Sequence, residues 1–169
     1  MALTQYTNSY VTVEEADDYM DTRIDSANWF SSDYLTREAS LVTASSLVDD
    51  NPWVGSAVSS TQSLAWPRNN AIYSDDRMGA VITIASTDKA PELVKKAVYE
   101  QALHLIDNED IMQGKSQTFE SITVGSISIS DSNNDVTRTP MKSPYMIKAI
   151  RPLIVRGKSG LGQGWWRAN

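Results

Sequence analysis

Leu41–Arg68, with the sequence LVTASSLVDDNPWVGSAVSSTQSLAWPR, is the stretch around which the rest of the chain is organised. Its first part carries apolar residues at helical spacing and stops before Pro52, because proline pushes the residue before it out of the helical region. The remainder is a connector that holds Trp53 and Trp66. Buried tryptophans are strong anchors, so we expect this connector to be pinned in place. The residues leave open whether it also carries a function or only joins two helices.

Four helices are expected, each from apolar residues that recur at helical spacing. The first spans Ser9 to Ile24 and starts with a capping box between Thr12 and Glu15. The second covers Asp33 to Val48, the third begins at Ala90-Pro91 as the central core helix, and the fourth spans Tyr145 to about Val155 with a kink at Pro152. The positions predicted to face inward are Val13, Ala16, Met20 and Ile24, then Tyr34, Leu41, Ala44 and Val48, then Leu93, Val94, Ala97, Val98, Ala102, Leu105 and Ile106, and finally Met146, Ile150, Leu153 and Ile154.

Between the third and fourth helices, residues 117–130 predict a β-hairpin, because apolar and polar residues alternate on both sides of a Gly125-Ser126 turn. A lone hairpin is marginal in water, so it is expected to pack on the helices or to pair with a neighbouring subunit. Val81–Ile84 predicts a brief strand or an extended loop, and Asn28–Ser32 predicts a turn. The apolar positions of the predicted hairpin are Ile122, Val124, Ile127 and Ile129.

Composition excludes several classes of protein. A chain of 169 residues fits one domain, and the lack of cysteine removes disulfides, thiolate catalysis and most zinc sites. The single histidine, His104, lies in a helical pattern without a serine nucleophile motif, so we expect no catalytic residue, no metal site and no cofactor. The chain has neither a membrane-spanning apolar run nor a secretory signal, so no membrane partner is expected.

The net charge of −6 conceals a division along the chain. Residues 1–135 hold 21 acidic and eight basic residues, a net charge of −13, whereas the chain from Val136 onward holds seven basic residues and no acidic one. An acidic body joined to a basic C-terminal part predicts a differently charged partner for each. That partner is a nucleic acid, another protein or a neighbouring copy.

Residues 156–169 carry four glycines and are predicted to form a flexible basic arm, following a helical domain over residues 1–155. The fold class expected is therefore mainly α, a small helical bundle with an inserted β-hairpin and an extended C-terminal arm. Tryptophan and arginine are favoured anchors of protein interfaces, so the arm is expected to dock on a partner. Stacking of nucleic-acid bases and an unstructured tail are the alternatives. The predicted docking residues are Arg156, Lys158, Trp165, Trp166 and Arg167.

Residues 8–155 resemble tailed-bacteriophage head–tail adaptor (connector) proteins, a sequence group that sometimes carries a DnaT-like single-stranded-DNA-binding label. The stretches that carry the resemblance are Ser9-Tyr10-Val11-Thr12, Trp53-Val54-Gly55, Gln62 to Arg68, Pro91 to Ala97 and Ile150 to Ile154. The most specific part is a pair of short motifs in the connector. Its signature residues are Trp53, Gly55, Gln62, Trp66, Pro67 and Arg68.

The resemblance implies a structural virion protein, not an enzyme, that self-associates into a ring, usually twelve-fold, and joins the portal to the tail. The implied partners are the portal protein, which the C-terminal arm would contact, and tail proteins of the tube or nozzle. DNA would pass through the channel without specific binding. The protein would be made in the bacterial host cytoplasm and act at the head–tail interface of the virion.

Two other functions compete with this one. A single-stranded-DNA-binding module would use the same basic residues and tryptophans, although dedicated binders are usually basic over the whole domain. An enzyme built on paired carboxylates is the third hypothesis, and the chain offers it no recognisable nucleophile or metal motif.

Overall fold

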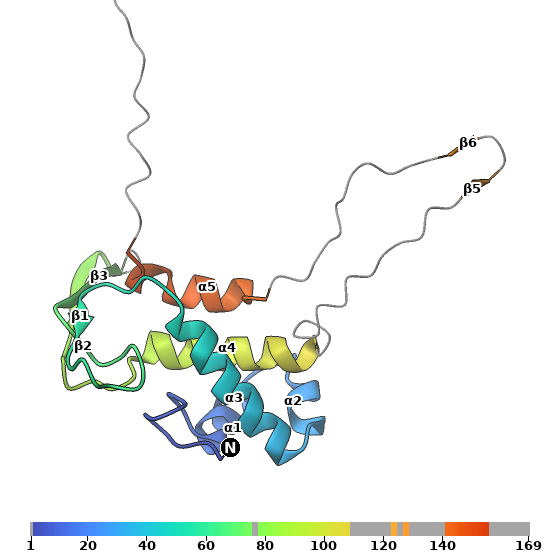
Figure 1. Cartoon of the computed structure of the whole chain (residues 1–169), viewed down its shortest axis with the longest axis horizontal. Coiled ribbons are helices and arrows are strands. Elements are labelled where there is room, and N and C mark those ends of the chain that lie inside the picture. The colour runs from blue at the N-terminus through green and yellow to red at the C-terminus, as the bar shows by residue number, and fades with distance from the viewer. Residues whose placement is uncertain (1, 76–77, 109–122, 125–126, 129–140, 156–169) are drawn as a thin grey trace, which may run out of the picture.

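The computed structural model describes residues 2–75, 78–108, 123–124, 127–128 and 141–155. Figure 1 shows helix α4 at the centre, with α5 along one side of it, α1 and α2 on the other, and α3 crossing it. The expectation of a mainly α fold holds for these residues. The helices span Val13–Asp21 (α1), Ala27–Ser31 (α2), Tyr34–Asp49 (α3), Glu92–Asp107 (α4) and Pro144–Ile150 (α5), followed by a 3₁₀ helix over Arg151–Leu153 (η2).

Helix α1 begins with the predicted capping box. The Thr12 hydroxyl accepts the backbone N–H of Glu15 at 3.2 Å, and the Glu15 carboxylate accepts the backbone N–H of Thr12 at 3.1 Å. These bonds satisfy N–H groups that the first turn of a helix leaves without partners. The prediction for Ile24 is wrong, because the helix ends at Asp21 and the Ile24 side chain is fully exposed. The inward-facing residues confirmed here are Val13, Ala16 and Met20.

The turn predicted around Trp29 is instead the short helix α2, in which Trp29 is fully buried and its Nε1 donates to Asp17 Oδ1 at 2.7 Å. Helix α3 starts at Asp33, whose carboxylate accepts the backbone N–H of Thr36 at 2.6 Å. Tyr34 was expected to face the core but lies in the first turn of α3, beyond the packed part of the helix, and is 49% exposed. The expected core positions Leu41, Ala44 and Val48 are confirmed as fully buried.

Helix α4 is the core helix, as its broad apolar face predicts. Six of the seven residues predicted to face inward are buried, and Leu93 is partly buried against the core. Helix α5 is shorter than predicted, because the backbone tightens into η2 where Pro152 removes a hydrogen-bond donor. The predicted positions Met146, Ile150 and Leu153 are buried, and Ile154 is partly buried.

The connector holds more β structure than the sequence predicts. Beyond the connector, the brief strand predicted at Val81–Ile84 is confirmed as part of β4. Its partner β3 was not expected, and the two strands form an antiparallel hairpin in which Ile72 pairs with Thr83 and Ser74 with Val81. A smaller sheet joins the two ends of the connector, and a third pairs Val124 with Ile127, as the predicted Gly125-Ser126 turn requires. Ile122 and Ile129 of that predicted hairpin lie outside the described residues. The strands are Ser56–Ala57 (β1), Arg68–Asn69 (β2), Ala71–Asp75 (β3), Ala80–Ile84 (β4), Thr123–Val124 (β5) and Ile127–Ser128 (β6).

Gly55 is the position at which the connector admits no side chain. Its φ of +73° lies in the left-handed region that favours glycine. A Cβ built there would stand 2.2 Å from the carbonyl oxygen of Asn69, which is backbone of the adjacent strand β2. Gly79 has a similar φ of +61°, but a Cβ there would meet nothing within 4 Å. The two glycines therefore have similar backbone conformations, but only Gly79 has room for a Cβ atom.

We expect Gly55→Ala to lower the free energy of unfolding more than Gly79→Ala does. The Gly79 variant carries only the strain of an alanine in the left-handed region, about 1–2 kcal/mol. The Gly55 variant adds a backbone clash, worth about 1–3 kcal/mol more. Urea denaturation of both variants measures the difference, and equal losses would show that β2 moves aside without cost.

Candidate nucleic-acid interface

One partly buried carboxylate, that of Asp49 at the end of α3, holds the connector in place. Its Oδ1 accepts a hydrogen bond from the Tyr10 hydroxyl, and its Oδ2 accepts the backbone N–H of Ala65 at 3.0 Å. The Tyr10 oxygen also accepts the backbone N–H of Trp66 at 3.1 Å. Burial raises the pKa of Asp49, against the opposing effects of these donors and of the charge on Arg68. Burial raises the pKa of Tyr10 as well, so its hydroxyl keeps the proton that it donates.

The two connector tryptophans pack edge to face, with ring centroids 5.7 Å apart and an interplanar angle of 81°. Both are buried, and Trp53 Nε1 donates to the carbonyl of Asp49 at 3.3 Å. Trp66 Nε1 is buried without a hydrogen-bond partner among the described residues. Trp53 also forms a β-bridge with Ile154, which ties the connector to the end of the described body. The prediction that both tryptophans are structural pins is confirmed.

The polar signature residues also act within the fold. The Arg68 guanidinium donates to the carbonyls of Val54, Ala65 and Gly55 at 2.7, 3.2 and 2.8 Å. Gln62 Nε2 donates to the carbonyls of Leu64 and Pro67 at 2.7 and 3.2 Å, and the Trp66–Pro67 peptide is cis. The Arg68 donors are thus directed at backbone oxygens, which leaves this cation poorly placed to bind a phosphate. The signature identifies a way of folding the connector, and a binding surface must be sought elsewhere.

Helix α5 is fixed to the core by a buried amide. Gln101 of α4 is fully buried, and its Nε2 donates to the carbonyl of Met141 at 2.8 Å. Its Oε1 accepts the backbone N–H of Ser143, also at 2.8 Å. The Ser143 hydroxyl then accepts the backbone N–H of Tyr145 at 3.2 Å and caps the helix. This chain of contacts sets the position of α5, with Met146 and Ile150 pointing into the core.

The outer face of α5 combines an aromatic ring with two cations. Tyr145 is 61% exposed, and Ile147, Lys148 and Arg151 are exposed beside it. Lys148 lies one turn after Tyr145, and Arg151, the first residue of η2, lies one turn after Lys148, so successive members of this exposed set are neighbours. The guanidinium of Arg23 lies 6.0 Å from the centre of the Tyr145 ring, close enough for a cation–π contact on that side. This contact helps to hold the ring in place while much of its surface remains open.

Arg23 is itself firmly held. It donates to both carboxylate oxygens of Asp25, at 2.7 and 2.6 Å, and pairs with the buried Glu100 of α4. The hydrogen bonds to Asp25 are the main reason that its pKa is raised further, and burial acts in the opposite direction. Arg23 also lies 5.9 Å from the ring of Tyr19, which stacks on Tyr99. The contact to Tyr145 therefore rests on a rigid polar network.

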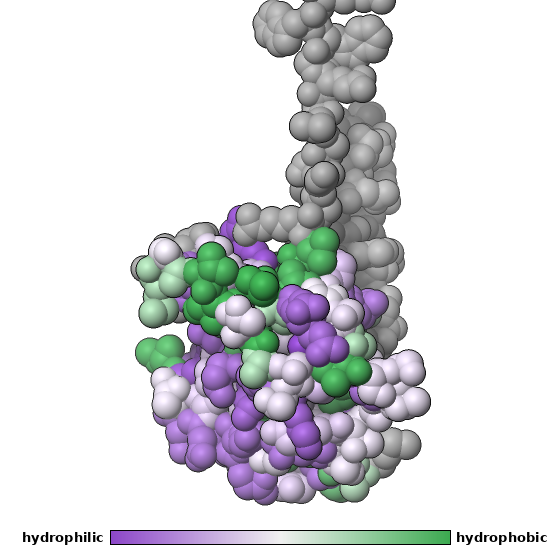
Figure 2. Space-filling model, turned by 90° about the vertical axis from the view of Figure 1, so that its left-hand side faces the viewer, coloured by the Kyte–Doolittle hydropathy of each residue, from purple (hydrophilic) through white to green (hydrophobic). Residues whose placement is uncertain are grey.

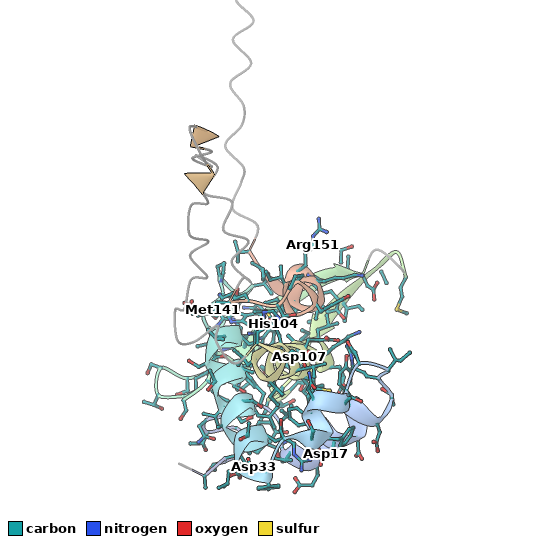
Figure 3. All side chains as sticks on the ribbon, turned by 90° about the vertical axis from the view of Figure 1, so that its right-hand side faces the viewer. Asp17, Asp33, His104, Asp107, Met141 and Arg151 are labelled. Carbon is teal, nitrogen blue, oxygen red and sulfur yellow. The ribbon has the colours of Figure 1, made fainter. Side chains whose placement is uncertain are left out.

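Two exposed cations on this face, Lys148 of α5 and Arg151 at the start of η2, have no acidic partner among the described residues. Among the described residues, Lys148 and Arg151 make no ion pair, whereas Lys142 pairs with Asp50 at 3.6 Å and donates to its carbonyl at 2.8 Å. Residues 141–155 contain no acidic side chain. Figure 3 shows Arg151 projecting from the end of the body opposite Asp33. The folded body thus presents a small basic face on one side and acidic helices on the other.

Sequence reasoning placed the binding residues farther along the chain. The predicted docking residues lie outside the described residues, so their role stays a prediction. The face formed by Tyr145, Lys148 and Arg151 was missed, because only the inward-facing residues of this helix were considered. The spacing of three between an aromatic and two cations, within a segment free of acids, is the signal that could have found it. The residues outside the description are Arg156, Lys158, Trp165, Trp166 and Arg167.

The described residues contain no group of three or more His, Asp or Glu side chains that could hold a metal ion. His104 lies on α4, with its Nδ1 3.4 Å from Asn108 Nδ2. None of the helices in this part of the chain is both long and apolar enough to cross a bilayer. The expectation that the protein is not an enzyme stays a prediction.

Comparison with known proteins gives one match. A family model described as "Putative DnaT-like ssDNA binding protein" matches residues 3–167, nearly the whole chain. No curated protein and no solved structure matches this chain.

We expect Tyr10→Phe to destabilise the fold by about 1–3 kcal/mol, because it leaves Asp49 Oδ1 without its Tyr10 donor and the buried Trp66 N–H without an acceptor. Tyr34→Phe is the matched control, since that tyrosine is half exposed, and it should change stability by less than about 0.5 kcal/mol. Urea denaturation followed by circular dichroism measures both. Equal effects would show that the buried hydroxyl does not hold the connector.

Proposed function

We propose that this chain, which belongs to the family described as "Putative DnaT-like ssDNA binding protein", binds single-stranded DNA through the outer face of helix α5. The observation that carries the proposal is the exposed Tyr145 ring beside Lys148 and Arg151, two cations without acidic partners among the described residues. The family description supports single-stranded DNA as the ligand. The exposure of Tyr145 and the two cations supports the outer face of α5 as the binding site.

The chemistry of this face suits a single strand better than a duplex. Unpaired bases expose their flat surfaces, and stacking on an aromatic side chain contributes about 1–3 kcal/mol per base. Lys148 lies one turn after Tyr145 and Arg151 one turn after Lys148, so they can contact the phosphates next to a stacked base. A ring and two cations read no base edge, so this face would bind strands of many sequences.

The charge of the rest of the molecule limits how a strand can bind. The chain carries a net charge of −6, and α1 alone carries five of its acids, at Glu14, Glu15, Asp17, Asp18 and Asp21. Phosphates are repelled from that side and attracted only to the C-terminal part. We therefore propose weak binding in one orientation, with a strong dependence on salt.

Tyr145→Ala should weaken binding of a fluorescein-labelled oligothymidine about 5- to 150-fold, the equivalent of one lost stacking interaction of about 1–3 kcal/mol. Fluorescence anisotropy at low salt measures the dissociation constant. Tyr34→Ala is the control, because it removes a similarly exposed tyrosine from the acidic side, and it should leave binding unchanged. Equal losses in both variants would remove the proposed stacking site.

The double variant Lys148→Ala/Arg151→Ala should reduce the slope of log K against log salt concentration by about 1.4, since each cation on a single strand contributes roughly 0.7. Lys96→Ala, an exposed lysine on α4, is the matched control and should leave the slope unchanged. A double variant with the salt dependence of the parent protein would show that phosphates bind elsewhere. Binding that is undetectable even at low salt would reject the proposal as a whole.

A second function, that of a head–tail adaptor, is supported by a different observation. Several large apolar side chains are exposed on the β3–β4 hairpin and on α5, which binding of a single strand does not require. Together with the divided charge and the resemblance in the signature residues, they suit protein contacts. In this function the chain forms a ring on a portal protein in the virion, contacts tail proteins below it, and lets DNA pass through its channel.

The two functions are separated by measuring mass. For the adaptor, native mass spectrometry of the purified chain should give a monomer that becomes a ring only when a portal protein is added. Deletion of residues 157–169 should abolish that binding and leave the helical circular dichroism unchanged. Portal binding that survives the deletion would show that the arm is not the anchor, and a lack of binding by the full chain would reject the adaptor function.

A further inference from the structure

Among the described residues, the outer face of the β3–β4 hairpin carries two exposed apolar side chains, two hydroxyl side chains and no charge. In the register of the two strands, Ile72 lies opposite Thr83 and Ser74 lies opposite Val81. All four are exposed, and Val81 reaches 74%. The alternate residues of the same strands, including Tyr73 and Ile84, pack against the core. Figure 2, which views the molecule from the side of the hairpin, shows hydrophobic side chains gathered on the upper part of that side and hydrophilic ones below.

The exposed side chains of this face favour binding of a partner, and their chemistry limits what that partner can be. A sheet of two strands is marginal in water and gains stability from a further apolar layer. β-branched residues exposed in a hairpin with unpaired strand edges also invite association. Because the face carries no cation, it attracts no phosphate, and its occupant should bring apolar or aromatic side chains.

The chain leaves the described body beside this hairpin. The backbone N–H of Val155 donates to the carbonyl of Pro52 at 2.7 Å, and η2, just before it, contacts β3. Figure 1 shows the end of η2 next to β3. The Val155 side chain is half exposed. Whatever follows Val155 in the sequence therefore starts near the β3–β4 hairpin.

The sequence that follows contains apolar and aromatic side chains of the kind expected in an occupant of this face. Residues 156–169 contain Leu161, Trp165 and Trp166 and no acidic residue. The stretch from Arg156 to Trp165 can span up to about 33 Å when extended, at roughly 3.3 Å per residue, which is enough to reach across a two-stranded hairpin. Each tryptophan can bury about 150–250 Å², so the pair can cover side chains the size of Ile72 and Val81.

We propose that the C-terminal segment, residues 157–169, docks on the outer face of its own β3–β4 hairpin, with Trp165 and Trp166 covering Ile72 and Val81. Docking within one chain is favoured because a short flexible tether gives the segment a local concentration in the millimolar range. The docked segment is the ground state of the free protein. A partner that binds the tryptophans must first release them, so the hairpin competes with any ligand of the arm, whichever of the two functions holds.

The test uses the full chain labelled with 5-fluorotryptophan, which gives one ¹⁹F signal for each of the five tryptophans. The signals of Trp165 and Trp166 are assigned from Trp165→Phe and Trp166→Phe variants, and a soluble gadolinium chelate broadens signals that face solvent. We expect both assigned signals to be protected in the parent chain. Val81→Lys should make them several-fold more sensitive to the chelate and leave the three buried tryptophans unchanged, which reports that the fold is intact.

Leu35→Lys is the matched control, because Leu35 of α3 is 71% exposed, close to the 74% of Val81, and lies on another part of the surface. It should leave Trp165 and Trp166 protected. Tenfold dilution should also leave them protected, as docking within one chain requires. Protection that disappears on dilution would assign the face to a second copy and overturn the proposal. So would terminal tryptophans that are fully accessible in the parent chain.

Discussion

The contact between the partly buried Asp49 carboxylate and the hydroxyl of the buried Tyr10 is the constraint on which the arrangement of this protein depends. It joins three parts of the chain that are distant in sequence, namely the segment before α1, the end of α3 and the close of the connector. A buried carboxylate is costly unless it is fully hydrogen-bonded. The connector must therefore return to bring the Ala65 N–H to it, and this return places Trp66 against Trp53. Once the connector is closed, the last residues of the body can pair beside Trp53 and hold α5 in place.

This dependence separates the residues that identify the fold from those that can bind a ligand. Arg68 donates to three backbone carbonyls and Gly55 leaves no room for a Cβ, so both are required by the connector's own structure. A motif built in this way persists whatever the protein binds, because its loss costs the fold. Ligand-binding residues can change without loss of the fold on surfaces outside the connector, such as the outer face of α5. A family signature of this type is thus a poor guide to a ligand.

Local signals in the sequence predicted those features whose partners are close in the chain. The capping box at Thr12, the long apolar face of α4 and the pairing of Val124 with Ile127 all follow from residues within a few positions of one another. The errors arose where distant contacts decide the outcome. Ile24 fits the stripe of α1 but lies past the end of the helix. Strand β3, which pairs with the expected strand at Val81–Ile84, was missed because it is held against η2, a contact that periodicity does not reveal. The exposed Tyr145 face was missed for a different reason: Met146 and Ile150 were correctly predicted to face the core, but the opposite side of the same helix was not considered.

The division of charge acts on both proposed functions in the same way. With the acidic helices on one side and Lys148 and Arg151 on the other, a polyanion or an acidic protein surface approaches from the side of α5 and is repelled elsewhere. Orientation is therefore set at long range, before any contact forms, and the short-range contacts need only be strong enough to retain the partner. For a strand of DNA the ring of Tyr145 can do this. For a protein ring the exposed apolar side chains are required, and the outer face of the β3–β4 hairpin becomes available only if the C-terminal segment leaves it.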